Sequence, residues 1–166
     1  MTNGQNLTQS GDTYNILFVC TGNTCRSPMA EALARAELEQ RKWRHVDIAS
    51  AGVAALDGQP ASEHALAVLE RHGMHAARHR SRALTQELVS WADLILAMSR
   101  SHLGPISRMG GSERMALLSY FAHEDERRGG VADPFGGDEN DYEVTFQQLE
   151  QLVCQSLDRL TPILSP

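Results

Sequence analysis

Short apolar runs alternate with longer amphipathic segments along this chain. Residues 15–20 read Asn-Ile-Leu-Phe-Val-Cys, a β-branched and aromatic run without polar alternation. Such a run is typical of a central strand that is buried on both faces of a sheet. Residues 46–53 and 92–98 predict two further strands, and residues 114–118 predict a weaker fourth one.

The segments between these runs have the spacing of helices. Ser27 suits a helix N-cap and Pro28 the first helical position, so a helix is expected to continue to Lys42. Further helices are expected over residues 60–72 with Gly73 as the stop signal, from Thr85 to Trp91, from Ser99 onward, and over residues 141–160. In the last helix, the predicted inward positions are Phe146, Leu149, Val153 and Leu157.

This order of elements predicts an α/β fold of three layers, in which helices cover both faces of a four-stranded parallel, doubly wound sheet. Residues 1–14 are polar and are expected to form a flexible N-terminal tail, and residues 15–166 a single domain. In such folds, ligands bind beyond the carboxyl ends of the strands. The loop after the first strand is therefore the expected place for a functional site.

Charge and composition argue against two classes of partner. The 166 residues carry a net charge of −6, whereas a nucleic-acid-binding protein usually has a basic surface. No apolar run approaches the roughly 20 residues that span a bilayer, and the polar start lacks the pattern of a signal peptide. The three cysteines, an odd count, suit free thiols in a reducing compartment. We therefore expect a cytoplasmic protein that binds neither nucleic acid nor membranes.

The loop between the first strand and the first helix holds Cys20 and, after five residues, Arg26. Its small residues can turn backbone N–H groups inward around an anion, and the following helix adds its positive end. Arg26 offers a planar fork for two phosphate oxygens. These groups are expected to lower the pKa of Cys20, which would make it a nucleophilic thiolate. The spacing alone also suits a buried strand-end cysteine and a surface arginine, but Asn23, Ser27 and the flanking elements favour a phosphate loop.

Residues 19–31, Val-Cys-Thr-Gly-Asn-Thr-Cys-Arg-Ser-Pro-Met-Ala-Glu, resemble the signature of the low-molecular-weight protein tyrosine phosphatases. The resemblance continues through residues 50–52, 92–98 and 133–135, and it covers the chain from residue 15 to about residue 160. It implies a flavodoxin-like fold and hydrolysis through a cysteinyl-phosphate, with no metal and no cofactor.

The resemblance also implies a role for each matching residue. Cys20 would be the nucleophile, and the phosphate would be bound by Arg26 and the loop residues Thr21, Gly22, Asn23, Thr24 and Cys25. The Ser27 hydroxyl would bond the thiolate, and Asn23 would hold the strained loop through Ser50 and His72. Asp133, in the loop Asp133-Pro134-Phe135, would protonate the leaving group and then accept a proton from water.

Two residues bear on the substrate. The tyrosine-specific members of the family carry a bulky aliphatic residue where this chain has Thr24, which is shorter and polar. A branch of the family that acts on protein phosphoarginine resembles this chain in the loop Cys-Thr-Gly-Asn-Thr-Cys-Arg-Ser and in residues 133–137. Phe135 stands alone before Gly136, and one aromatic ring can pack along a guanidinium. We therefore expect a protein-arginine phosphatase, with a protein-tyrosine phosphatase as the alternative.

The other cysteines and the histidines receive separate interpretations. Cys25 is a candidate resolving thiol that would trap an oxidised Cys20 as a disulfide, although a small residue filling space behind the loop would also fit. Cys154 is expected in the core. His75 and His79 are interpreted as surface residues because no third metal ligand is evident beside them.

Two functions of other classes are disfavoured. Thioredoxin-linked arsenate reductases resemble this chain in fold and loop, but they need two further cysteines near residues 84–98, where it has none. A non-catalytic phosphoprotein-binding module would be expected to lack Cys20 or Asp133, and both are present. The expected partner is a phosphorylated protein substrate, and the expected state is a monomer or a weak dimer.

Overall fold

The computed structural model describes residues 13–123 and 129–165. Its sheet contains the strands β1 (Tyr14–Cys20), β2 (Val46–Gly52), β3 (Leu94–Ala97) and β4 (Met115–Leu117). The strands pair in the order β2-β1-β3-β4, and every pairing is parallel. The predicted four-stranded parallel sheet is thus confirmed, with β1 between two neighbours.

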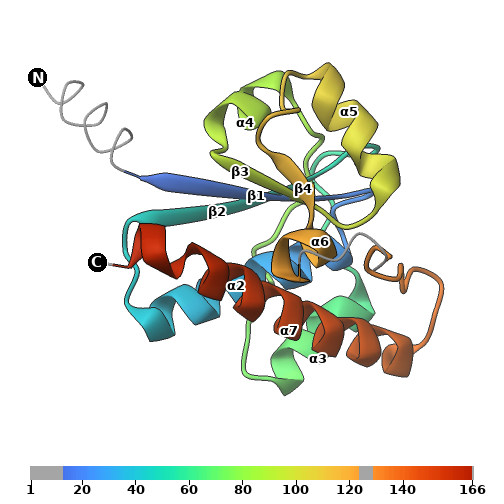
Figure 1. Ribbon diagram of the computed structural model, residues 1–166. Coiled ribbons are helices and arrows are strands. Elements are labelled where there is room, and N and C mark those ends of the chain that lie inside the picture. Colours follow the sequence, from blue (N-terminus) through green and yellow to red (C-terminus); the bar gives the residue numbers. More distant parts are fainter. Residues whose placement is uncertain (1–12, 124–128, 166) are drawn as a thin grey trace, which may run out of the picture.

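Helices cover both faces of this sheet (Figure 1). One face carries α2 (Arg26–Arg41), α3 (Glu63–Arg71), α6 (Leu118–His123) and α7 (Glu139–Leu164). The other carries α4 (Gln86–Trp91) and α5 (Leu103–Arg108), and the short 3-10 helix η1 (Arg100–His102) leads into α5. The arrangement has the three layers expected of a doubly wound α/β fold.

The hydrophobic core consists of two clusters, one on each face of the sheet. Ile16 and Phe18 of β1 belong to the cluster beneath α2 and α7, whereas Leu17 and Val19 belong to the cluster beneath α4 and α5. Successive side chains of a strand point to opposite faces, so a strand with a core on both sides is apolar at every position. This explains why residues 15–20 lack polar alternation.

Several element boundaries differ from those predicted. β1 begins at Tyr14, so the predicted tail is too long by at least that residue, and residues 1–12 lie outside the described part. The helix expected from residue 60 begins at Glu63, because the Ser62 hydroxyl accepts the N–H of Ala65 as a side-chain cap. Helix α6, which follows β4 directly, is not among the helices predicted from the sequence.

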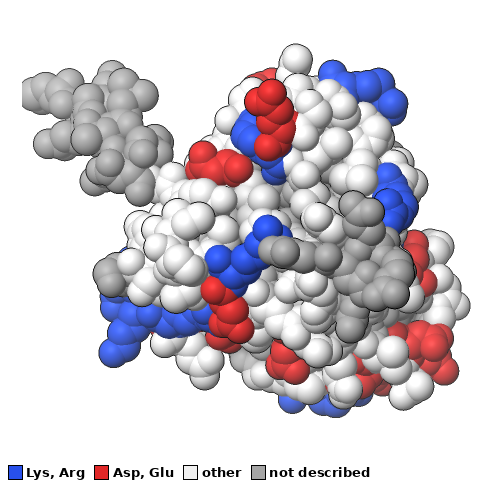
Figure 2. All heavy atoms as spheres, in the orientation of Figure 1, with Lys and Arg blue, Asp and Glu red and all other residues white. Residues whose placement is uncertain are grey.

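The surface carries no single field of positive charge on the face that Figure 2 shows. Lys and Arg side chains are interspersed there with Asp and Glu side chains. Within residues 13–123 and 129–165, no helix is both long and apolar enough to cross a membrane.

Candidate active site

The loop of residues 21–25 leaves the carboxyl end of β1 and enters α2 directly. Because β1 pairs with β2 on one side and with β3 on the other, loops from all three strands converge around it. This is the position at which doubly wound folds bind ligands. The N–H groups of Val53 and Ala54 donate to the carbonyls of Cys20 and Thr21, which fastens the loop to the segment after β2.

Gly52 at the end of β2 permits a close approach to this loop. A Cβ atom at that position would lie 2.9 Å from the backbone nitrogen of Asn23 and closer still to the carbonyl oxygen of Thr21. Only glycine fits between two backbones at such a separation without displacement.

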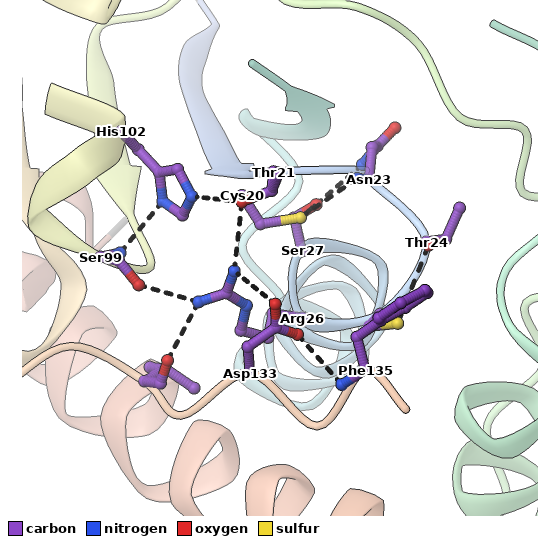
Figure 3. A network of polar contacts seen from close by, with 12 residues as sticks. Cys20, Thr21, Asn23, Thr24, Arg26, Ser27, Ser99, His102, Asp133 and Phe135 are labelled. Atoms are coloured by element: carbon purple, nitrogen blue, oxygen red, sulfur yellow. Dashed lines mark hydrogen bonds and ion pairs between the residues drawn. The ribbon is translucent and has the colours of Figure 1, made fainter. Parts of the chain in front are cut away.

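Cys20 lies at the base of the loop, with its side chain almost fully buried. Its Sγ is 2.9 Å from Ser27 Oγ and accepts the backbone N–H of Asn23 at 3.2 Å (Figure 3). Burial raises the pKa of the Cys20 thiol, whereas the Ser27 hydroxyl, the Asn23 N–H and the charge of Arg26 each lower it.

The predicted lowering of the Cys20 pKa is wrong for this structure, in which burial outweighs the lowering groups. The sequence indicated which groups would lower the pKa but not how completely the thiol would be removed from water. Ser27 also differs from its predicted role as N-cap, because α2 already begins at Arg26. Its hydroxyl instead lies against Cys20 Sγ and accepts the side-chain amide of Asn23 at 2.8 Å.

Arg26 is a buried cation whose two terminal nitrogens differ in how closely they are bonded. Its Nη1 donates to Ser99 Oγ at 2.8 Å and to the carbonyl oxygen of Val131 at 3.1 Å. Among the described residues, its Nη2 makes long contacts of 3.5 Å, to Thr21 Oγ1 and to Asp133 Oδ2 (Figure 3). The guanidinium is therefore anchored through one nitrogen, while the other remains available for an anion in the pocket.

Asp133 and Phe135 face the loop from the segment that precedes α7. Asp133 Oδ1 accepts the backbone N–H of Phe135 at 3.1 Å, a local turn that presents the second carboxylate oxygen to Arg26. Phe135 leaves 77% of its surface exposed. The segment is held against the end of β3 by the N–H of Val131, which donates to Met98 at 2.7 Å.

These groups enclose a pocket of about 250 Å³. It is lined by Cys20, Thr21, Gly22, Thr24, Cys25, Arg26, Asp133 and Phe135. Nucleophile, cation and carboxylate thus meet in one small cavity, although Asp133 is more than 100 residues from Cys20 in sequence. A larger groove of about 980 Å³ runs along the outer edge of β2, but it contains none of these residues.

Asn23 holds the loop in its shape. It is fully buried and adopts a positive φ of 57°, a conformation that needs support from its surroundings. Its side-chain amide donates to Ser27 and to Ser50, and its side-chain oxygen accepts the backbone N–H of Arg82. The predicted bond to Ser50 is present, and Ser50 in turn donates to Glu31 Oε1.

The predicted support by His72 is wrong. His72 caps the end of α3, where its Nε2 lies 2.9 Å from Glu143 and its ring stacks on Phe146 at 4.2 Å. The histidine that bonds Asn23 is His79, whose Nε2 donates to the Asn23 carbonyl oxygen at 2.7 Å. His79 is thus not the simple surface residue that the sequence suggested.

Cys25 is also buried, and its thiol is 3.1 Å from the hydroxyl of Tyr142 and 3.5 Å from that of Ser62. Burial and the contact with Cys25 raise the pKa of Tyr142 to about 12. Cys154 is only half-buried, so its predicted place in the core is wrong in part. Among the described residues, no three His, Cys, Asp or Glu side chains are grouped so as to hold a metal ion.

The residues that contact Arg26, Thr21 or Cys25 and were not predicted from the sequence include Ser99, His102, Val131 and Tyr142. One local signal was available, because Ser99 and His102 stand three positions apart and form a reciprocal capping box at the start of η1. Val131 and Tyr142 reach the site only through the packing of the whole fold.

The pocket thus combines a cysteine sulfur that accepts the backbone N–H of Asn23, an arginine guanidinium and a carboxylate. This combination is typical of sites that transfer a phosphoryl group through cysteine. The sequence model of the low molecular weight phosphotyrosine protein phosphatase family matches residues 15–162. The chain therefore belongs to this family.

Individual relatives differ in the substrate that their names state. The protein-arginine-phosphatase of Geobacillus stearothermophilus is 42% identical over 149 residues, which cover 89% of this chain and 96% of the relative. A probable low molecular weight protein-tyrosine-phosphatase, AmsI of Erwinia amylovora, is 36% identical over 149 residues, which cover 89% of this chain and 97% of that protein.

A solved structure adds a chemical likeness. It is a cysteine-to-serine mutant of the YwlE arginine phosphatase with a phosphorylated active-site serine. This chain superimposes on it with a TM-score of 0.85 at 38% identity, over 90% of this chain and 97% of the other.

Proposed function

We propose that this protein hydrolyses phosphoarginine in proteins through a cysteinyl-phosphate on Cys20, with Asp133 as general acid and base. The observation that carries the proposal is the shared pocket of Cys20, Arg26 and Asp133. The mutant relative with a phosphorylated active-site serine supports a covalent intermediate at the loop nucleophile. The protein-arginine-phosphatase names of relatives at 42% identity support the substrate.

In the first step, the thiolate of Cys20 attacks phosphorus and forms the S–P bond while the P–N bond to the arginine breaks. Asp133 gives its proton to the departing nitrogen, which replaces the P–N bond with an N–H bond, so the arginine leaves with its guanidinium charge intact. The loop N–H groups and the free nitrogen of Arg26 bind the phosphoryl oxygens as charge develops on them.

In the second step, water attacks phosphorus and the S–P bond breaks. Asp133, now a carboxylate, accepts a proton from the water, and inorganic phosphate is released. Cys20 leaves as a thiolate, which the Ser27 hydroxyl stabilises by donating to it across their 2.9 Å contact.

The choice of phosphoarginine over phosphotyrosine rests on Thr24 and Phe135, which line the same pocket as Cys20. The hydroxyl and short side chain of Thr24 suit a narrow polar group better than a phenyl ring. The exposed ring of Phe135 offers a face along which a guanidinium can lie. Phosphotyrosine is the alternative substrate, since relatives such as AmsI are named as probable protein-tyrosine-phosphatases.

The test is parallel hydrolysis of matched peptides that carry phosphoarginine or phosphotyrosine, with Cys20→Ser as the blank. Faster release of phosphate from the phosphoarginine peptide is expected. Faster release from the phosphotyrosine peptide would overturn the substrate and leave the mechanism, whereas no release from either would overturn the phosphatase. Asp133→Asn should slow the first step on both peptides, because the leaving group then lacks its proton donor.

We also propose that Cys25 protects the nucleophile. Peroxide would oxidise the Cys20 thiolate to a sulfenic acid, and Cys25 would displace water from it to form a disulfide that thiols can reduce. Cys25 must first leave its contacts with Tyr142 and Ser62. Peroxide-treated wild type should regain activity with dithiothreitol and Cys25→Ser should not; equal recovery of both would remove this role.

The partner in this proposal is a phosphorylated protein, which the protein would meet in the cytoplasm as a monomer or a weak dimer. Sedimentation of the full chain at several concentrations tests the oligomeric state. A stable higher oligomer would contradict it.

A further inference from the structure

His102 is a buried histidine behind the candidate active site that has no part in the mechanism proposed above. It ends η1, just after β3, and only 1% of its surface is exposed. Both ring nitrogens have partners: the backbone N–H of Ser99 donates to Nδ1 at 3.1 Å, and Nε2 lies 2.9 Å from Thr21 Oγ1 (Figure 3). The ring therefore joins the turn after β3 to the phosphate loop after β1.

These two contacts determine where the ring carries its proton. Since Nδ1 accepts an N–H, the proton of the neutral imidazole must be on Nε2, and Nε2 must donate to the hydroxyl of Thr21. Burial and the neighbouring charge of Arg26 lower the pKa of His102 to about 4, against a smaller raising influence of Asp133. At neutral pH the ring is thus in the neutral form that this arrangement requires.

The Thr21 hydroxyl is oriented as a consequence. Its oxygen accepts from His102 and lies 3.5 Å from Nη2 of Arg26, so both lone pairs face N–H donors. The hydroxyl hydrogen must then point away from both. Thr21 is an exposed residue that lines the pocket next to Cys20 and Arg26, so this hydrogen can be donated to an oxygen atom there.

Ser99, the second residue bonded to His102, also contacts the guanidinium of Arg26. Ser99, whose backbone N–H bonds the ring, accepts Nη1 of Arg26 with its side-chain hydroxyl at 2.8 Å. Arg26 thus contacts Ser99 through one terminal nitrogen and Thr21 through the other, and both of these residues are bonded to His102. A displacement of the ring would disturb both contacts of the fork.

We propose that His102 is a positioning residue for phosphate binding: it orients Arg26 through Ser99 and Thr21, and it directs the Thr21 hydroxyl into the pocket as an additional donor to a phosphoryl oxygen. The inference rests on the proposed phosphatase function but is independent of whether the substrate carries arginine or tyrosine. A ring that only filled space behind the loop would support folding without affecting the affinity for phosphate.

The first measurement is the dissociation constant of inorganic phosphate, by calorimetry on the full chain. Thr21→Val removes the hydroxyl with little change in shape, from an exposed position that does not endanger folding. It should weaken binding about 10-fold or more, since a hydrogen bond to a charged group is lost, and Thr21→Ser should restore most of the affinity. Unchanged binding by Thr21→Val would overturn the role of the hydroxyl.

Two variants of His102 separate its two bonds. Asparagine retains an acceptor near the Nδ1 position, whereas glutamine retains a donor near the Nε2 position. His102→Gln should therefore bind phosphate more tightly than His102→Asn or His102→Ala. Equal dissociation constants for all three variants, each folded by its circular dichroism spectrum, would overturn the positioning role. His75→Ala, at an exposed histidine, is the matched control.

A double-mutant cycle tests whether His102 acts through Thr21. The effects of His102→Ala and Thr21→Val on phosphate affinity should be less than multiplicative when combined, because the second change removes a contact already lost. Fully multiplicative effects would overturn the coupling. Turnover of p-nitrophenyl phosphate by the wild type is measured alongside: its absence would overturn the phosphatase function, whereas the binding data decide the role of His102 in either case.

Discussion

The candidate nucleophile is a residue on which opposing influences act. Cys20 loses water by burial, which disfavours the thiolate, and it gains one hydroxyl, two backbone N–H groups and one nearby cation, which favour it. Ser27 contributes the closest of these contacts and is itself fully buried. The ionisation of Cys20 should therefore depend measurably on this single hydroxyl.

We predict that Ser27→Ala raises the pKa of Cys20, because the group removed is one that lowers it. The rate of alkylation by iodoacetamide should then rise only at higher pH than in the wild type, since the thiolate is the reacting form. The measurement is made in a background that carries Cys25→Ser and Cys154→Ser, so that Cys20 is the one cysteine left to react with iodoacetamide. Ser107→Ala, at an exposed serine, is the control; an unchanged alkylation profile for Ser27→Ala would contradict the prediction.

Thr24 is the residue at which substrate preference is expected to change. Replacement by isoleucine adds an apolar wall to a pocket that also contains Phe135, and a phenyl ring would pack against it. We predict that Thr24→Ile shifts the ratio of the kcat/KM values for phosphotyrosine and phosphoarginine toward phosphotyrosine by about 10-fold or more. This is the size of effect that one or two buried methylene groups have in such pockets. Competition between the two phosphopeptides measures the ratio, and the same ratio in both proteins would remove Thr24 from the account of selectivity.

At the scale of elements, the phosphate loop is held by segments distant in the chain. Ser50 of β2 and the backbone of Arg82 bond the side chain of Asn23, and His79 bonds its carbonyl oxygen. These ties are buried or half-buried, so they have little competition from water. The loop geometry is thus a property of the packed sheet edge, not of residues 21–25 alone.

Two histidine variants test this dependence. His79→Ala should lower kcat/KM for p-nitrophenyl phosphate about 10-fold, because the strained Asn23 loses one of its supports. His72→Ala, a histidine-to-alanine change on the neighbouring α3 cap, should leave kcat/KM close to that of the wild type. A larger loss of kcat/KM in His72→Ala than in His79→Ala would contradict this prediction and favour His72, the support predicted from the sequence.

These histidines also show which parts of the fold and the site can be predicted from the sequence. The strands, the loop from Cys20 to Ser27 and the acid loop at Asp133 could be predicted, because local patterns and a family resemblance identify them. His79 and His102 could not, because their partners are 56 and 81 positions away in the chain. No hydrophobic period or turn signal encodes such contacts, and the resemblance led to His72, which the fold places at the end of a helix.

At the scale of the whole molecule, α3 and α7 support the loop from behind. Arg71 of α3 and its C-cap residue His72 contact Glu143 of α7, and the preceding residue of α7, Tyr142, contacts Cys25. The two helices are thus joined by an ion cluster on the surface and by the loop cysteine inside.

The ion cluster should make stability depend on pH in a defined window. Arg71 lowers the pKa of Glu143 to about 2 in the folded protein, below its ordinary value of 4.5. A carboxyl with a lowered folded pKa stabilises the fold above its unfolded pKa, and this contribution is lost as the pH falls from about 4.5 toward 2. Since Arg71 is half exposed, the contribution should be about 1 kcal/mol or less.

We therefore predict that Glu143→Gln lowers the free energy of unfolding at pH 7 by this small amount, and that the difference from the wild type shrinks steadily below pH 4.5. Urea unfolding of both proteins between pH 7 and pH 2 measures it, with Glu70→Gln on the exposed side of α3 as the matched control. A difference that persisted at the lowest pH would mean that Glu143 stabilises the fold by packing and not by its charge. A difference that disappeared near neutral pH would mean that its carboxylate is not held by Arg71 at all.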